Sequence, residues 1–502
     1  MSDAFQFEPQ MSDVEALMWS VEDHEPLLRS TIVIVVHLAE GLSFERVERH
    51  VERVTRLLPR FKDKVVSSPV PGVNPRWVPD ASFDLPYHLR RVVAPPPANF
   101  DTSLRLAEPM AAEGLDKARP PWQMLFVEGL AGSRSALVVK IHHSLTDGIG
   151  LVKLGLVLFD LEPDPGPEWS PTQGSTTDGT DAREAAAESE RDPLAAAGIE
   201  PNSFDRMLDD LSHELQRGVS MLRQFAPLVA TGVREILSDP EPGPQAQALL
   251  EMLRSAARVA APTARALSPL MTGRSMAGRL AVIEVALDDA VRMAKAAGGT
   301  VNDVYLASVT AGLEEYHRRH GSTAVGVRIG VPINTRTGET DFLLRNQVSA
   351  VRVLAPFGVD DPIQRIRLLH DLVAQARSEP AIGLVEAIAG VANRLPMLRS
   401  LVGAAVGALD AVVSNVPGPG IPLYIGGAQV LGMIGFGPRG GAALNVTMGG
   451  HIGDLKVAVN ADLAAAPDVE VLFDSLRQGF TQTLRKPPRK PQPRRRTRSV
   501  TA

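Results

Sequence analysis

The hydrophobic and polar positions of the first 160 residues alternate between two periods. Residues 31–38, TIVIVVHL, form a β-branched apolar run that predicts a strand, and residues 44–58, FERVERHVERVTRLL, repeat apolar positions at helical spacing. Residues 123–130, QMLFVEGL, and 135–143, SALVVKIHH, predict two more strands, and the AGSR between them favours a hairpin. This mixture of periods predicts an α/β domain.

The same mixture returns from about residue 280. RLAVIEVAL at 279–287 predicts a strand, NDVYLASVTAGLEEYHRRHG at 302–321 a helix, and VGVRIGVPIN at 325–334 a further strand. Residues 411–462 contain short apolar runs broken at Pro-Gly, Gly-Gly and Gly-Asp pairs, which predict an antiparallel meander. We therefore expect a second α/β unit in the C-terminal half.

Between these units the pattern is lost. Residues 162–203 are rich in Pro, Gly, Ser, Thr and acids, which indicates a linker, and an apolar helical stripe begins at Phe204. The polar face of that helix mixes acids with Arg, so packing against protein is favoured over a membrane surface. The predicted organisation is an N-terminal domain at 1–161, the acidic linker at 162–203, a C-terminal domain with a helical insertion at 204–484, and a basic, disordered tail at 485–502.

Composition narrows the class of protein. A chain of 502 residues with 44% hydrophobic residues is too long for one core, so two or three domains are expected. It has no cysteine, which excludes disulfides, thiolate metal sites and a cysteine nucleophile and favours the cytoplasm. The start carries acids where a secretory signal carries basic residues, and no run approaches the ~20 apolar residues that cross a bilayer. We expect a protein that is not exported and that meets membranes, if at all, at the inner surface.

The charges are unevenly distributed. The tail from Arg485 to Arg498 holds eight Lys and Arg residues and no acid, and removing them from the formal net charge of −6 leaves −14 on the rest of the chain. An acidic body without a nucleic-acid motif argues against nucleic acid as a partner. The basic tail is a candidate tether to an anionic lipid surface.

The sequence KIHHSLTDGIG at 140–150 is the strongest candidate site. A metal site built from His142, His143 and Asp147 is disfavoured, because adjacent residues of a strand point to opposite faces. The same alternation predicts different roles for the two histidines. Asp147 stands where a helix N-cap is expected, and Gly148 fits a close turn that leaves no room for a Cβ atom.

The stretch HHSLTDG resembles the HHxxxDG motif of the CoA-dependent acyltransferase superfamily. Its surroundings look like the bacterial wax ester synthase/diacylglycerol acyltransferase family over roughly residues 11–160 and 275–470. Two departures are the Pro120-Pro121-Trp122 sequence where the family has Pro-Leu-Trp, and Met448-Gly449 where a Ser-Tyr pair is expected. The similar segments are MSDVEALMWSVE, WVPDASFDLPYHLRR, LDKARPPWQMLFVEGL, TVNDVYLASVTAGL, VPINTRT and SNVPGPGIPLYIGG.

The resemblance implies two chloramphenicol-acetyltransferase-like domains with the active site in a channel between them. It implies that His143 is the general base and that Pro121 and Trp122 form part of the substrate channel. Support for the site is expected from His142, Asp147, Gly148, Asn302 and Asp303. Polar side chains that end strands are candidate oxyanion donors: Ser414, Asn415, Asn445 and Thr447.

The activity implied is O-acylation by long-chain acyl-CoA, with diacylglycerol as acceptor and triacylglycerol as product. A fatty alcohol acceptor, which would make the protein a wax ester synthase, and a non-catalytic lipid-binding protein on the same fold stay open as alternatives. No metal or other cofactor is expected beyond the co-substrate acyl-CoA. Because these substrates are lipids, the surface of a membrane or lipid droplet is an expected partner.

Overall fold

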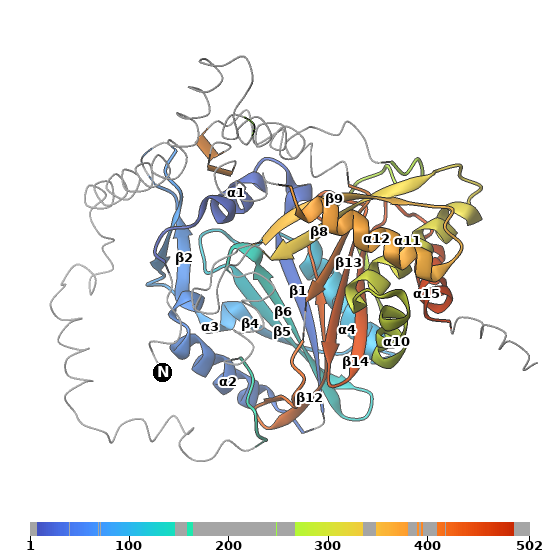
Figure 1. Cartoon of the computed structure of the whole chain (residues 1–502). Coiled ribbons are helices and arrows are strands. Elements are labelled where there is room, and N and C mark those ends of the chain that lie inside the picture. The colour runs from blue at the N-terminus through green and yellow to red at the C-terminus, as the bar shows by residue number, and fades with distance from the viewer. Residues whose placement is uncertain are drawn as a thin grey trace, which may run out of the picture.

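The computed structural model describes residues 8–39, 41–68, 70, 72–145, 158–163, 247, 267–334, 348–379, 389–390, 393–394, 409–416 and 418–485. Most of these residues belong to two six-stranded sheets and the helices packed on them (Figure 1). Four predicted segments lie outside the described residues: the linker from residue 164 onward, the stripe that begins at Phe204, the segment with Asp147 and Gly148, and the tail beyond Arg485. Among the described helices, none is both long and apolar enough to cross a bilayer.

The first sheet has the strand order β11-β12-β1-β6-β5-β4. The strands predicted at 31–38, 123–130 and 135–143 are confirmed, and β5 and β6 form the predicted antiparallel hairpin. The bounds are β1 Thr31–Leu38, β4 Leu89–Val93, β5 Trp122–Leu130, β6 Arg134–His142, β11 Tyr424–Ile425 and β12 Ala428–Phe436. The outer elements of this half are α1 Asp13–Val21, η2 Pro26–Leu28, α2 Phe44–Leu57, η3 Pro59–Lys62, α3 Leu85–His88, α4 Phe100–Ala112 and the hairpin of β2 Asp63–Val66 with β3 Arg76–Pro79.

The strands β11 and β12 cross from the C-terminal half into the first sheet. β12 pairs antiparallel with β1, with Val33 opposite Phe436 and Val36 opposite Met433. In Figure 1, β12 extends away from the other late strands toward the blue and teal strands. The sequence analysis assigned all of 204–484 to the second domain. The strands β11 and β12 depart from that assignment, because β12 pairs with β1 and buries its apolar residues in the first sheet. The predicted meander was also wrong, since β10 and β13 pair in parallel and β11-β12 leave the second sheet.

The second sheet has the strand order β7-β14-β13-β10-β8-β9. Its helices gather on one side in Figure 1. Two of them, α11 and α15, cross closely, because a Cβ atom at Gly479 of α15 would lie 2.3 Å from the backbone nitrogen of Gly312 in α11. The bounds are β7 Gly278–Ala286, β8 Gly326–Asn334, β9 Val348–Pro356, β10 Ala411–Val416, β13 Leu444–His451, β14 Asp454–Asp462, α10 Leu287–Ala297, α11 Val301–Arg319, α12 Pro362–Arg377 and α15 Val469–Leu484.

A shared core joins the two halves. Val33 of β1 and Val138 of β6 pack in the same buried cluster as Leu104 of α4, Leu280 of β7 and Phe436 of β12. The opposite face of the first sheet and the helix face of the second sheet form separate buried clusters. The apolar interface in the shared cluster, together with the strand exchange, fixes the position of the first sheet against the second.

Candidate active site

The two histidines lie where a buried central strand of the first sheet ends. His142 is the last residue of β6, opposite Thr31 of β1, and His143 begins the short 3-10 helix η4, His143–Leu145. The backbone N–H of His143 donates to the carbonyl oxygen of Ser30 at 2.7 Å. The pairing with the chain before β1 therefore continues one residue past the strand and holds the turn that carries His143.

His142 is buried, and hydrogen bonds to Ser144 hold its imidazole at Nδ1. Its Nδ1 accepts from the backbone N–H of Ser144 at 3.1 Å and lies 2.7 Å from the Ser144 hydroxyl. A backbone N–H can only donate, so Nδ1 carries a lone pair and the single proton of the neutral ring is on Nε2. That nitrogen lies 3.4 Å from a carboxylate oxygen of Glu22. These contacts give His142 a role in holding the turn, and its support of an active site stays a prediction.

His143 has a partly exposed side chain, unlike His142. Its position after the end of a buried strand presents an imidazole on a turn that backbone bonding holds in place. A neutral imidazole with an ordinary pKa of about 6.5 can accept a proton from an alcohol near neutral pH. Of the two histidines, His143 is the partly exposed one, and its role as the general base stays a prediction.

A cavity lies beside this strand end, between the two halves. Arg29 and Thr31 line it from the first half, and the chain before β7, the crossover after β12 and the end of β14 line it from the second. Thr31 is the cross-strand partner of His142, so the cavity lies near the end of β6, although neither histidine lines it. The remaining lining residues are Pro26, Leu27, Ala111, Arg274, Ser275, Met276, Pro438, Arg439, Gly441, Ala442, Asn460 and Asp462.

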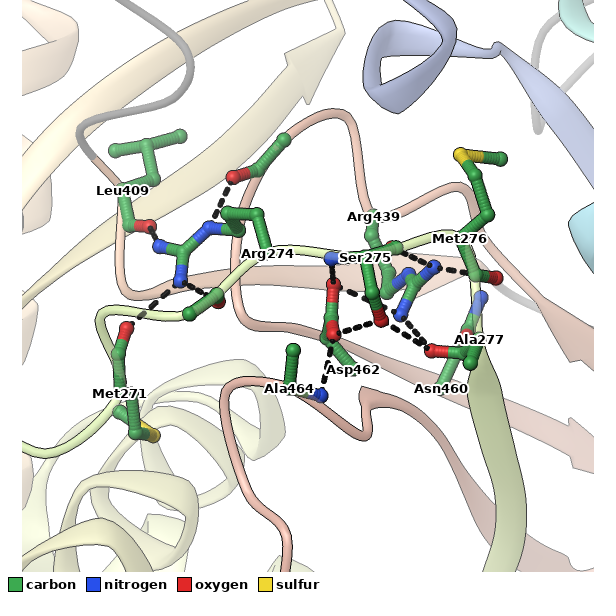
Figure 2. Close-up of polar contacts among 12 residues, drawn as sticks. Met271, Arg274, Ser275, Met276, Ala277, Leu409, Arg439, Asn460, Asp462 and Ala464 are labelled. Atoms are coloured by element: carbon green, nitrogen blue, oxygen red, sulfur yellow. Dashed lines mark hydrogen bonds and ion pairs between the residues drawn. The ribbon is translucent and has the colours of Figure 1, made fainter.

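The far wall of this cavity is a bonded polar network (Figure 2). The buried carboxylate of Asp462 accepts from the backbone N–H and the hydroxyl of Ser275, each at 2.7 Å, and lies 3.2 Å from Arg439. Arg439 also donates to the carbonyls of residues 275, 276 and 277, and Arg274 donates to the carbonyls of residues 271, 273, 409 and 441. Both arginines hydrogen-bond to backbone carbonyls of the surrounding loops, and these bonds stabilise the wall of the cavity.

The candidate oxyanion donors of β10 and β13 form a hydrogen-bonded chain. Ser414 lies 2.9 Å from the hydroxyl of Thr447, which donates to the amide oxygen of Asn445, whose amide nitrogen donates to the carbonyl of Pro438. Since the Thr447 proton is directed to Asn445, the Ser414 hydroxyl is the donor of their pair. The side chain of Asn415 is exposed, and strand alternation places it on the opposite face from Ser414. The structure brings three of the four together.

Asn302 and Asp303 lie in the first turn of α11. The helix begins at Val301 and Thr300 caps it. Asp303 completes the capping box by accepting from the backbone and hydroxyl of Thr300, and it also accepts from His370 of α12 at 2.9 Å. These contacts stabilise the helix start and its packing on α12, which is a structural role.

Trp122 has no exposed surface. Its indole N–H donates to the carbonyl of Phe61 at 2.7 Å, and its ring stacks on His88 at 4.5 Å between centroids. The carbonyl of Pro121 accepts from the backbone N–H of His142. Trp122 therefore packs in the core and Pro121 supports the strand end, whereas lining of a substrate channel stays a prediction.

Three residues of the site were not found from the sequence: Glu22, Ser30 and Ser144. Ser144 lies inside the motif, two residues after His142, and that spacing was a usable signal for a turn closed by a side chain. Glu22 and Ser30 precede the motif by more than 100 residues, and no local pattern marks them as its neighbours.

Comparison with known proteins shows the family. The catalytic-domain profile of the wax ester synthase/diacylglycerol acyltransferase family matches residues 11–305, and its C-terminal domain profile matches residues 344–483. A Mycobacterium tuberculosis H37Rv protein described as a diacylglycerol O-acyltransferase is 32% identical over 95% of this chain and 92% of its own length. A second described so from that strain is 27% identical over 82% of this chain and 81% of its own length.

Solved structures support the fold. The wax ester synthase/diacylglycerol acyltransferase from Marinobacter aquaeolei VT8 superposes with a TM-score of 0.58 at 18% identity, over 94% of this chain and 98% of that chain. The first condensation domain of the calcium-dependent antibiotic synthetase superposes with a TM-score of 0.55 at 15% identity, over 95% of this chain and 96% of that chain. The predicted chloramphenicol-acetyltransferase-like fold of two domains is therefore confirmed. The chain belongs to the wax ester synthase/diacylglycerol acyltransferase family and is an acyltransferase.

Proposed function

We propose that this protein transfers the acyl group of long-chain acyl-CoA to the free hydroxyl of 1,2-diacylglycerol, with His143 as the general base. The observation that carries the proposal is the position of His143, which is partly exposed and begins a backbone-bonded turn directly after the buried strand β6. A cavity between the two halves is lined by Thr31, the cross-strand partner of the preceding His142. The curated relatives, described as diacylglycerol O-acyltransferases, favour diacylglycerol as the acceptor.

The reaction needs one residue that first accepts and then donates a proton. Neutral His143 takes the hydroxyl proton of the acceptor while the oxygen attacks the thioester carbonyl, which forms a tetrahedral oxyanion. When the intermediate collapses, the carbon–sulfur bond breaks and the imidazolium delivers its proton to the departing sulfur of CoA. The products are triacylglycerol and free CoA, and no acyl-enzyme is formed. The route requires no cofactor beyond acyl-CoA.

The hydrogen-bonded chain from Ser414 to Pro438 bears on how the oxyanion is stabilised. The hydroxyls of Ser414 and Thr447 are already committed as donors within the chain, whereas the amide of Asn445 has a second N–H beyond the one given to Pro438. We therefore favour Asn445 among the predicted donors. One such donor contributes roughly 10²- to 10³-fold in rate.

Two other functions use the same fold. A fatty alcohol in place of diacylglycerol would make the product a wax ester, and the family description includes this activity. A lipid-binding protein without turnover would keep the fold and lose the base, and His143 is present. The diacylglycerol hypothesis places the protein in triacylglycerol synthesis and glycerol lipid metabolism, in the cytoplasm, with the basic tail meeting a membrane or lipid-droplet surface.

Purified protein incubated with palmitoyl-CoA and a panel of diacylglycerol, monoacylglycerol and hexadecanol tests the activity and the acceptor together. Replacing His143 by Ala should lower CoA release and triacylglycerol formation by roughly 10²- to 10⁴-fold, because the proton acceptor is lost. His320→Gln, a change of an outer histidine at the end of α11, serves as the matched control. Near-normal turnover by the His143 variant would refute the general-base role. A wax ester as the main product would show that a fatty alcohol, and not diacylglycerol, is the acceptor.

A further inference from the structure

The end of α1 lies behind the histidine pair. Glu22 is the C-cap of α1, and its side chain is 6% exposed. One carboxylate oxygen faces Nε2 of His142 at 3.4 Å, and the other lies 3.2 Å from Nζ of Lys117. Within the described residues, this buried Nε2 atom makes no hydrogen bond, and the Glu22 carboxylate at 3.4 Å is the anionic group paired with it. The negative charge of Glu22 therefore favours a proton on Nε2.

Lys117 keeps this carboxylate in place and charged. Its ammonium contacts Asp23 at 2.7 Å and Glu22 at 3.2 Å and donates to the carbonyl of Trp19, so its three protons all have acceptors. The Lys117 ammonium also lies over the Trp19 ring. That ring packs edge to face against the imidazole of His142, with 4.9 Å between the ring centroids. Burial raises the pKa of Glu22, but its interactions with His142 and then with Lys117 outweigh burial and hold the pKa below its usual value.

The other side of His142 holds the turn with the catalytic base. Only the Nε2–H tautomer lets Nδ1 accept from both the backbone N–H and the hydroxyl of Ser144. The alternative tautomer would set an N–H against the Ser144 N–H and open the turn. His143 lies between the two residues that this contact joins.

We propose that Glu22, held by Lys117, is a positioning residue for acyl transfer: it selects the Nε2–H tautomer of His142, which closes the turn onto Ser144 and thereby orients His143. This inference rests on the proposed function of His143. A base displaced by about 1 Å can lose on the order of 10²-fold in rate. Loss of the Glu22 acceptor should therefore lower kcat, whereas substrate binding has no reason to change.

The test compares Glu22→Gln with Glu22→Leu in the full chain. Gln keeps an oxygen acceptor for Nε2–H and should hold kcat within about threefold, whereas Leu removes it and should lower kcat at least about tenfold, with the KM for palmitoyl-CoA within about twofold. Glu108→Gln is the matched control, because that carboxylate on α4 is also largely buried and paired, with Arg279, but does not contact the histidines. Full kcat in Glu22→Leu would overturn the proposal.

A spectroscopic measurement tests the tautomer directly. In protein labelled with ¹⁵N-histidine, the His142 resonances, identified by their loss in His142→Gln, should show a protonated Nε2 and an unprotonated Nδ1. A wild-type His142 that is protonated on Nδ1 would overturn the proposal even if Glu22→Leu fails to fold. If the wild type shows no acyl transfer to any acceptor, the proposed function fails, and a comparison of the wild-type and Glu22→Leu spectra still decides whether Glu22 sets the tautomer.

Discussion

Replacing Asn445 by Ala perturbs the start of β13, where the chain passes from β12 in the first sheet into the second sheet. The amide of Asn445 donates to the carbonyl of Pro438 at 2.9 Å and accepts from the hydroxyl of Thr447 at 2.7 Å. Its cross-strand partner Asn460 donates to the neighbouring carbonyl of Gly437. The two asparagines thus fasten successive carbonyls of the segment that runs from β12 to β13.

The cost follows from which groups lose partners. Thr447 can turn its proton toward Ser414, since either hydroxyl of that pair can donate, so its loss is compensated. The Pro438 carbonyl has no such alternative, but residue Pro438 is partly exposed and lines the cavity, which gives water a route to it. An orphaned buried acceptor costs about 1–3 kcal/mol, and partial exposure favours the lower half of that range, about 1–2 kcal/mol. For a domain of this size, that corresponds to a melting temperature lower by about 2–8 °C.

Thermal unfolding followed by circular dichroism measures this change, and Asn415→Ala is the matched control because its side chain is exposed on the opposite face of β10. The control should melt within about 1 °C of the wild type, as exposed substitutions do. Equal melting temperatures for both variants would refute the anchoring argument. The same proteins test the oxyanion hypothesis, since a donor role predicts a kcat for Asn445→Ala that is at least about 10²-fold lower when measured well below the melting temperature.

Two further outcomes are expected. Gly479→Ala should lower the melting temperature, because a Cβ atom at Gly479 would lie 2.3 Å from the backbone nitrogen of Gly312. Overpacking of this kind costs about 1–3 kcal/mol, whereas Ala favours helix over Gly by up to about 1 kcal/mol. A variant as stable as the wild type by thermal unfolding would contradict the close crossing of α11 and α15. Truncation after Leu484 should weaken co-sedimentation with anionic liposomes at low salt, because each basic residue near such a surface contributes about 1 kcal/mol to binding. Turnover on detergent-dispersed substrate should stay unchanged. Equal co-sedimentation of the full-length and truncated proteins would refute the role of the tail as a tether.

The individual elements could be predicted from the sequence far better than their partners. The strand at Thr31–Leu38 and the helix at Phe44–Leu57 are found within one residue, because β-branched runs and helical periodicity are local signals. The sheet to which Ala428–Phe436 belongs carries no such signal. Its alternation specifies a strand with one buried face. Its partner β1 lies some 400 residues earlier in the chain, so no local pattern identifies that partner.

The site divides in the same way. His142 and His143 could be found because a pair of adjacent histidines before an Asp-Gly turn is compact in sequence, and alternation gave them different roles. The alternation argument extends only as far as His142, since the strand ends there and His143 begins a 3-10 turn. Glu22 acts on the site from the end of a separate helix, and only the packing of that helix against β6 makes it a neighbour.

The exchange of β12 into the first sheet has a consequence for synthesis on the ribosome. Until residues 428–436 emerge, β1 is an edge strand with unpaired backbone groups and an apolar sequence, and such edges promote aggregation between chains. The N-terminal half is therefore an incomplete folding unit, and the nascent chain must keep this edge from other copies while most of the protein is still being made. A fragment that ends before residue 428 should accumulate as aggregates, and the strand from β12, added as a separate peptide, is the natural agent to cap it.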